Sequence, residues 1–171
     1  MRRVIDWIDA LNEAIGRVVA WLSLLMVLIT VAVVILRYAF DLGWISMQES
    51  VTYLHATLFM LGAAYTLKHG GHVRVDIFYG KMDARGRAWV DFFGTLFLLI
   101  PVCLFILWIS AEYIAESWSV LEGSREAGGI PGVFLLKTLI PLFCLLMILQ
   151  GVSMMGHSWR VLRGGEADDE R

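Results

Sequence analysis

The sequence predicts an all-α integral membrane protein with four transmembrane helices, an amphipathic N-terminal helix in the membrane interface, and both termini cytoplasmic. The first observation behind this fold class is the composition. Of the 171 residues, 58% are hydrophobic and 18% are charged, whereas a soluble domain has roughly 45–50% and about 25%. A chain this short cannot bury so much apolar surface in one core. The other two observations are four runs without charge and an uneven distribution of Lys and Arg.

Four intervals contain no Asp, Glu, Lys or Arg: residues 18–36, 50–67, 92–111 and 138–159. They are 19, 18, 20 and 22 residues long, so as helices they reach roughly 27–33 Å, which matches the hydrocarbon core of a bilayer. Their apolar character is continuous and lacks the alternation of a transmembrane β-strand. We expect a single membrane domain over residues 1–163 and a disordered tail over residues 164–171, which is short, glycine-led and acidic.

The segment before the first run predicts the amphipathic interfacial helix. Its apolar residues recur at helical spacing, at Val4, Ile8, Leu11, Ile15 and Val18, and its acidic residues fall largely off that stripe. An extension of the first crossing into a partner protein explains the pattern equally well. Because no small-x-small cleavage site follows the run, we interpret it as a retained helix and not as a signal peptide.

The orientation follows from the positions of the basic residues. With the N-terminus inside, the inner segments hold 11 of the 14 Lys and Arg residues, and the outer segments hold Arg37, Arg125 and Lys137. This bias predicts that both termini and the loop of residues 68–91 are cytoplasmic. Since 16 Asp and Glu balance the 14 basic residues, the charge gives no reason to expect a nucleic-acid partner.

Helix ends are marked by several polar residues. Ser46 and Glu49 are spaced as a capping box at the start of the second helix, and an ion pair of Glu49 with a partner subunit is the alternative. Pro131 suits the first turn of the fourth helix, which places Lys137 one to two turns inside, where we expect it to snorkel to the outer interface. Asp83 is expected to cap the third helix, which extends past the lipid on its inner side.

The loop after the second helix has three readable features. Gly70 and Gly71 are expected to end that helix. Apolar and charged residues then alternate over residues 73–77, which predicts an extended segment with one apolar face. His69 and His72 have metal-compatible side chains, but no third ligand follows at a recognisable spacing, so we predict no metal site.

The polar residues inside the four runs are uncharged, and this absence of midplane charge argues against a complete ion-coupled carrier. His55 and His157 raise the alternative of a membrane-anchor subunit of a respiratory complex, with or without haem, but they lie near opposite membrane faces. Cys103 and Cys144 sit in apolar runs and are expected to be small buried hydrophobes. We find no pattern of catalytic residues and predict no cofactor.

Four short motifs follow one another in the chain: Gln48-Glu49 at the start of the second helix, Gly62-Ala63 within it, His72-Val73-Arg74-Val75-Asp76 after it, and Pro131, Lys137, Pro141 and Gln150 around the fourth helix. Their order and spacing resemble the small membrane subunit of tripartite ATP-independent periplasmic (TRAP) transporters. The resemblance covers roughly residues 15–160, and the run after the glycine turn is its most specific part.

This resemblance implies a bacterial inner-membrane protein that acts beside a large permease subunit, here a separate chain, and a periplasmic substrate-binding protein. In that family the large subunit holds the substrate and sodium sites, the small subunit enlarges the static scaffold, and most substrates are organic acids. Small side chains also mark the second helix as a contact face, either with the partner or inside the subunit. The candidate subunit-interface residues are Glu49, Ala56, Gly62, Ala63, His72, Arg74, Asp76 and Lys137.

Overall fold

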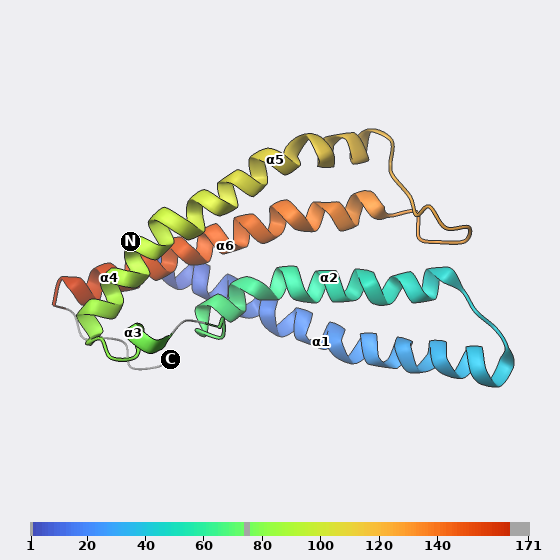
Figure 1. Cartoon of the computed structure of the whole chain (residues 1–171), viewed down its shortest axis with the longest axis horizontal. Helices are drawn as coiled ribbons and strands as arrows, with labels where there is room; N and C mark the ends of the chain where they lie inside the picture. The colour runs from blue at the N-terminus through green and yellow to red at the C-terminus, as the bar shows by residue number, and fades with distance from the viewer. Residues whose placement is uncertain (1, 74–75, 165–171) are drawn as a thin grey trace.

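The chain forms a bundle of long helices joined by short loops in a computed structural model, which describes residues 2–73 and 76–164 (Figure 1). Within those ranges the structure is helical and contains no strand, which confirms the all-α prediction. The elements in chain order are α1 (Arg2–Phe40), α2 (Ile45–Lys68), α3 (Asp76–Tyr79), α4 (Ala84–Gly94), η1 (Thr95–Leu99), α5 (Ile100–Ser119) and α6 (Val133–Leu162).

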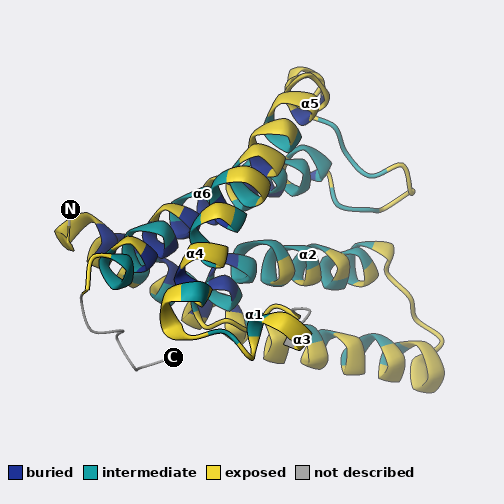
Figure 2. Cartoon of the chain, turned by 60° about the vertical axis from the view of Figure 1, so that its left-hand side comes forward, coloured by how far each residue is buried: buried dark blue, intermediate teal, exposed yellow. Residues whose placement is uncertain are grey.

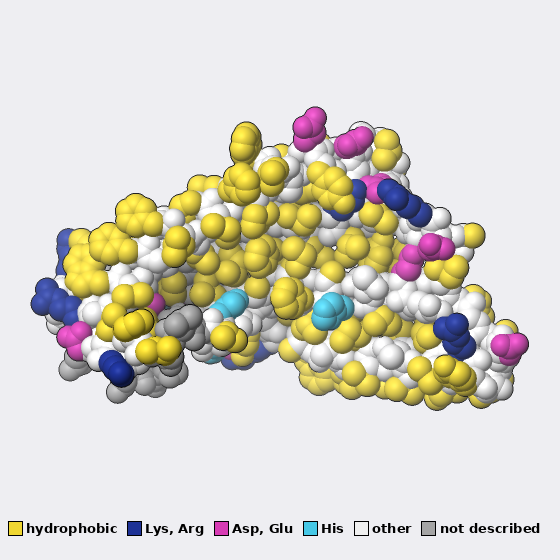
Figure 3. All heavy atoms as spheres, viewed as in Figure 1, with side chains coloured by type: hydrophobic (Ala, Val, Ile, Leu, Met, Phe, Trp, Pro, Cys, Tyr) yellow, Lys and Arg dark blue, Asp and Glu magenta, His cyan; other side chains and the backbone are white. Residues whose placement is uncertain are grey.

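Three helical segments in the described part of the chain are long and apolar enough to cross a membrane: Arg2–Phe40, Ala84–Ser119 and Val133–Leu162. The predicted runs 18–36, 92–111 and 138–159 each lie inside one of them. The remaining predicted run, 50–67, lies inside α2. This helix has 24 residues but is not one of the three apolar segments. Charged side chains gather toward the two ends of the molecule, with hydrophobic side chains between them (Figure 3).

α1 corrects the prediction of a separate interfacial helix. It runs without a break from Arg2 to Phe40, and its first half packs against the other helices of the chain. The buried residues are Ile5, Ile8, Asn12, Gly16 and Val19. Two members of the predicted apolar stripe, Val4 and Val18, are exposed instead. The helix is continuous because no proline interrupts it and because the buried positions keep one phase through residue 19.

The third predicted helix is longer than its uncharged run, as expected. Asp83 caps α4 by accepting a hydrogen bond of 2.9 Å from the backbone N–H of Gly86, which confirms the predicted cap. α4, η1 and α5 then follow end to end, with a π-helical turn at Thr95–Leu99 that ends two residues before Pro101. Because proline lacks an N–H and crowds the preceding turn, a wider turn at this point lets the helix continue.

The loop after α2 is only partly as predicted. Gly70 has a φ of 63°, and the N–H of Gly71 donates to the carbonyl of Thr66 at 2.9 Å, so the glycines end the helix as expected. The predicted extended segment is wrong at its end, because α3 begins at Asp76 and includes Ile77. No neighbouring strand is present in the described residues to complete an extended edge, and one helical turn satisfies the backbone locally.

α6 is the centre of the bundle. It lies between α5 and α2 (Figure 1) and carries much of the buried surface (Figure 2). The main cluster of buried apolar residues combines α2, α5 and α6 and consists of Ala64, Leu67, Cys103, Cys144, Leu146, Met147 and Met154. Cys103 and Cys144 are both free and buried, which confirms their prediction as small core residues.

Candidate functional site

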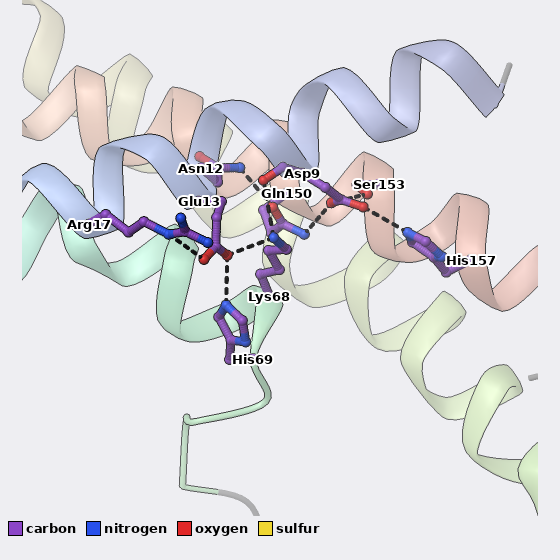
Figure 4. Close-up of polar contacts among 9 residues, drawn as sticks. All are labelled: Asp9, Asn12, Glu13, Arg17, Lys68, His69, Gln150, Ser153 and His157. Carbon is purple, nitrogen blue, oxygen red and sulfur yellow. Dashed lines mark hydrogen bonds and ion pairs between the residues drawn. The ribbon is translucent and has the colours of Figure 1, made fainter. Parts of the chain in front are cut away.

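A group of polar side chains joins the N-terminal half of α1 to α6 (Figure 4). The Asp9 carboxylate accepts hydrogen bonds from Ser153 Oγ at 2.6 Å, His157 Nε2 at 2.9 Å and Gln150 Nε2 at 3.1 Å. Arg160 Nη2 lies 2.7 Å from His157 Nδ1, so the contacts are consistent with a proton on Nε2. One carboxylate therefore holds three side chains of α6.

Asn12 extends this group into the core. Its Nδ2 donates to Gln150 Oε1 at 2.7 Å, while Gln150 Nε2 donates to Asp9. Asn12 and Gln150 are 1% and 3% exposed. Because both the donor and the acceptor of Gln150 are used, its amide has one orientation, and a shift of α1 along α6 would break both bonds.

Glu13 makes the matching connection from α1 to the end of α2. Its carboxylate lies 2.7 Å from Lys68 Nζ, 2.9 Å from His69 Nε2 and 3.0 Å from Arg17 Nε. Lys68 Nζ also donates to the backbone carbonyl of Asp9 at 3.3 Å. We call the whole set the N-terminal clamp: Asp9, Asn12 and Glu13 of α1, Lys68 of α2 with the adjoining His69, and Gln150, Ser153 and His157 of α6.

Sequence reasoning did not find the N-terminal clamp. It treated Asp9 and Glu13 as the solvated face of an interfacial helix, and Gln150 and His157 as mild polar residues inside a span. The available signal was the predicted topology. Acidic residues of the N-terminal segment and the basic or amide residues that end α2 and α6 fall on the same side of the membrane, where opposite charges can pair.

A second polar connection lies at the other end of the bundle, where Glu49 of α2 contacts the loop between α5 and α6. The carboxylate accepts a hydrogen bond from Ser124 Oγ and another, at 2.6 Å, from the backbone N–H of Ile130. A Cβ on Gly129 would lie 2.8 Å from Glu49 Oε2, so a residue without a side chain is needed there. We call Glu49, Ser124 and Ile130 the loop clamp.

The predicted capping box at Ser46 and Glu49 is wrong. α2 begins at Ile45, the N-cap position is Trp44, and no side chain caps the helix. Ser46 is therefore already inside the first turn, so its hydroxyl is not at the helix start. Glu49 is free to reach the loop instead.

Lys137 is paired rather than simply extended toward the interface. Its Nζ contacts the Glu122 carboxylate and lies 3.7 Å from the centre of the Tyr113 ring. Ser117 Oγ donates to the same carboxylate at 2.7 Å. The hydrogen bonds from Lys137 and Ser117 lower the pKa of Glu122 below its usual value of 4.5. The lysine side chain is 12% exposed, so the pair ties α6 to the loop and to α5.

The small residues of α2 lie in two environments. Ala64 is fully buried in the core cluster, against which Ala63 packs. A Cβ on Gly62 would lie 3.8 Å from Val19 of α1, and Ala56 is half-buried. These positions support packing inside the subunit, one of the two roles expected for them.

The charged motif after α2 is less informative. His72 is exposed and Asp76 begins α3. Arg74 lies outside the residues that the structure describes.

An apolar groove of about 690 Å³ opens beside α6. Its walls come from α4, η1, α5 and α6, and Val73 of the preceding loop and Tyr79 of α3 line it as well. The apolar lining includes Leu98, Val102, Ile106, Phe143 and Met147. Such a surface suits contact with lipid chains or with an apolar helix.

Comparison with known proteins decides the family. The sequence profile described as "Tripartite ATP-independent periplasmic transporters, DctQ component" matches residues 26–161, which are 136 of the 171 residues. The chain belongs to this family of TRAP transporter subunits. It is 27% identical over 115 residues to a Haemophilus influenzae protein named as a TRAP transporter small permease protein, and these residues are 66% of this chain and 71% of that protein. No match was found among solved structures.

The family assignment confirms the resemblance seen in the sequence. A TRAP small permease subunit is a multi-pass inner-membrane transport protein, which agrees with the three apolar helices. The family assignment also replaces the alternative of a respiratory anchor subunit. The ring nitrogens of His157 contact Asp9 and Arg160, so this side chain has a structural role in the N-terminal clamp.

Proposed function

We propose that this small subunit is a static brace for a separate large permease subunit during sodium-driven, binding-protein-dependent uptake of an organic acid, without catalysis of its own. The observation that carries the proposal is the pair of clamps at opposite ends of the bundle. The N-terminal clamp ties α1 to both α2 and α6, and the loop clamp ties α2 to the loop between α5 and α6. The bundle is thus fixed at both ends.

Fixed ends suit a scaffold and are unsuited to a carrier. Hydrogen-bonded side chains between packed helices resist sliding, since sliding leaves part-buried donors and acceptors without their partners. The four runs of the sequence also contain no Asp, Glu, Lys or Arg that could bind an ion or an organic anion at the midplane. The moving and substrate-binding parts therefore belong to the large subunit in this proposal.

The proposal includes four membrane crossings with both termini cytoplasmic. α2 has 24 residues and so reaches about 36 Å, enough to cross the bilayer. Only residues 41–44 separate α1 from α2, and α2 runs back alongside α1 (Figure 1). The excess of Lys and Arg on one side supports the orientation.

Labelling of single cysteines tests this topology. Glu126→Cys in the loop between α5 and α6 should react with a membrane-impermeant maleimide in intact cells, and Lys81→Cys should react only after the membrane is opened. The native cysteines are buried and give a low background. The reverse pattern, or equal labelling of both positions, would contradict the proposed orientation.

The large permease and the periplasmic binding protein are the proposed partners. We retain Glu49, Ala56, Gly62, Ala63, His72, Arg74, Asp76 and Lys137 as candidate subunit-interface residues. Arg74→Ala or Asp76→Ala is expected to weaken assembly, because both residues belong to the run that carries the most specific part of the family resemblance.

Copurification tests the proposed function as a whole. The tagged small subunit, coexpressed with its proposed large permease, is expected to retain that subunit in mild detergent. Deletion of the small subunit should abolish uptake in cells. Normal uptake after deletion would refute the proposal.

A further inference from the structure

α2 exposes one narrow line of residues. Its exposed positions are Ile45, Gln48, Thr52, His55 and Phe59, and its other residues are buried or half-buried. The intervals are three, four, three and four residues, which is the spacing of a seam between two packed helices. We call these five residues the α2 seam. Two sides of α2 are covered by α1 and α6, so the seam is the side left for another neighbour.

The α2 seam is more polar than the exposed surfaces of the other long helices. α1, α5 and α6 expose large apolar side chains along the membrane region, among them Trp21, Leu28, Phe105 and Leu145. The large hydrophobic residues exposed on α2 are Ile45 and Phe59, and three polar residues lie between them. α2 is also absent from the three helices apolar enough to cross a membrane. Its surface is suited to protein and not to lipid.

His55 is the residue of the α2 seam that most needs a hydrogen-bond partner. It follows Ile45 by ten residues, so it lies about 15 Å along the helix. Its ring stacks on Phe59 at 6.2 Å, and in the part of the chain that the structure describes no hydrogen bond reaches its ring nitrogens. An imidazole left unpaired in hydrocarbon is costly, which favours a protein group that covers it and accepts or donates a hydrogen bond.

We propose that the α2 seam packs against one transmembrane helix of the large permease subunit, which presents a hydrogen-bonding side chain or backbone carbonyl opposite His55. This inference rests on the proposed function, since it names the surface by which the brace holds its partner. Apolar contacts at the two ends of the seam and polar contacts at Gln48, Thr52 and His55 fix the register of the two helices.

Photo-crosslinking in the assembled complex tests the seam. Phe59→benzoylphenylalanine places a reactive ring where an aromatic ring already lies, and Phe105→benzoylphenylalanine is a matched control on α5. These phenylalanines are 71% and 55% exposed. We expect an adduct with the large permease from position 59 and none from position 105. An adduct from position 105 alone, equal adducts from both positions, an adduct of two small subunits, or no adduct from position 59 would overturn the proposal.

Substitution of His55 tests the hydrogen bond. His55→Leu should weaken binding of the large permease by about threefold or more, as measured with both subunits in detergent. His55→Gln keeps a donor and an acceptor and should bind within about twofold of the natural chain. Equal binding by His55→Leu would overturn this part of the proposal. If the natural chain itself fails to retain the large permease, the proposed function fails together with the seam; if it binds and the seam experiments fail, only the seam assignment falls.

Discussion

At the scale of single residues, the connection between α1 and α6 converges on one carboxylate. Asp9 accepts three side-chain hydrogen bonds from Gln150, Ser153 and His157, and its backbone carbonyl accepts another from Lys68. A half-buried carboxylate that serves several partners is costly to remove, because each side chain that donates to it is left without its bond. Asp9 is therefore the residue whose loss should loosen the bundle most.

Asp9→Ala is expected to lower the free energy of unfolding by about 1–3 kcal/mol, since the donors on α6 lose their acceptor. Thermal unfolding of the purified subunit in detergent measures this change. Asp6→Ala is the control. It removes a different carboxylate, about one turn earlier in α1 and at an exposed position, and should have little effect. Equal losses from both variants would show that charge, and not the N-terminal clamp, is responsible.

The environment of Glu122 predicts that the stability of the subunit falls at acid pH. Its pKa is lowered by the hydrogen bonds from Lys137 and Ser117, so the folded state favours the ionised carboxylate. The resulting stabilisation is present above pH 4.5 and is lost as the pH falls from there through the lowered pKa. The melting temperature should fall in this acid range, and Glu122→Gln should remove part of the fall. Glu126→Gln, at an exposed loop position, is the control, and an unchanged acid profile in Glu122→Gln would contradict the assignment.

At the scale of the helices, close approach depends on glycine at two crossings. A Cβ on Gly16 of α1 would lie 2.3 Å from the ring of Tyr65 and 2.6 Å from its Cβ, and a Cβ on Gly151 of α6 would lie 2.6 Å from Leu99. The neighbouring helices must move apart to admit a methyl group at either position. These contacts set the distance of α1 from α2 and of α6 from η1.

Gly16→Ala is expected to destabilise the subunit by about 1–3 kcal/mol, because the added methyl group overlaps Tyr65. Gly94→Ala makes the same chemical change where nothing lies within 4 Å, and it should be neutral or stabilise by up to about 1 kcal/mol through helix propensity. Chemical denaturation of the two variants compares them directly. A tolerated Gly16→Ala would mean that α1 and α2 are less closely packed than described.

At the scale of the whole molecule, the sequence predicted what depends on local composition. Three of the uncharged runs lie in apolar helices, the helix class is confirmed, and Asp83 caps α4 as expected. The errors at Ser46 and at the N-terminal segment share a cause. Glu49 and Asp9 bind groups 75 and 144 residues away, and no local pattern reveals such partners. The predicted topology puts the groups of the N-terminal clamp on one side of the membrane, but which residues pair could be found only from the packed structure.

The two clamps make the subunit one body from end to end, which is what bracing requires. At one end α1 is held to both α2 and α6, and at the other α2 is held to the loop between α5 and α6. In the proposed function, this body is a fixed reference along the full depth of the membrane for a large permease that changes shape against it. The central claim is thus that transport depends on the small subunit as a structural partner.

Uptake into proteoliposomes tests that claim most directly. Vesicles with equal amounts of the large permease are prepared with and without the small subunit, and an inward sodium gradient and the binding protein loaded with its organic acid are supplied outside. We expect uptake in the presence of the small subunit and loss of uptake without it. Equal rates in the two preparations would contradict the account.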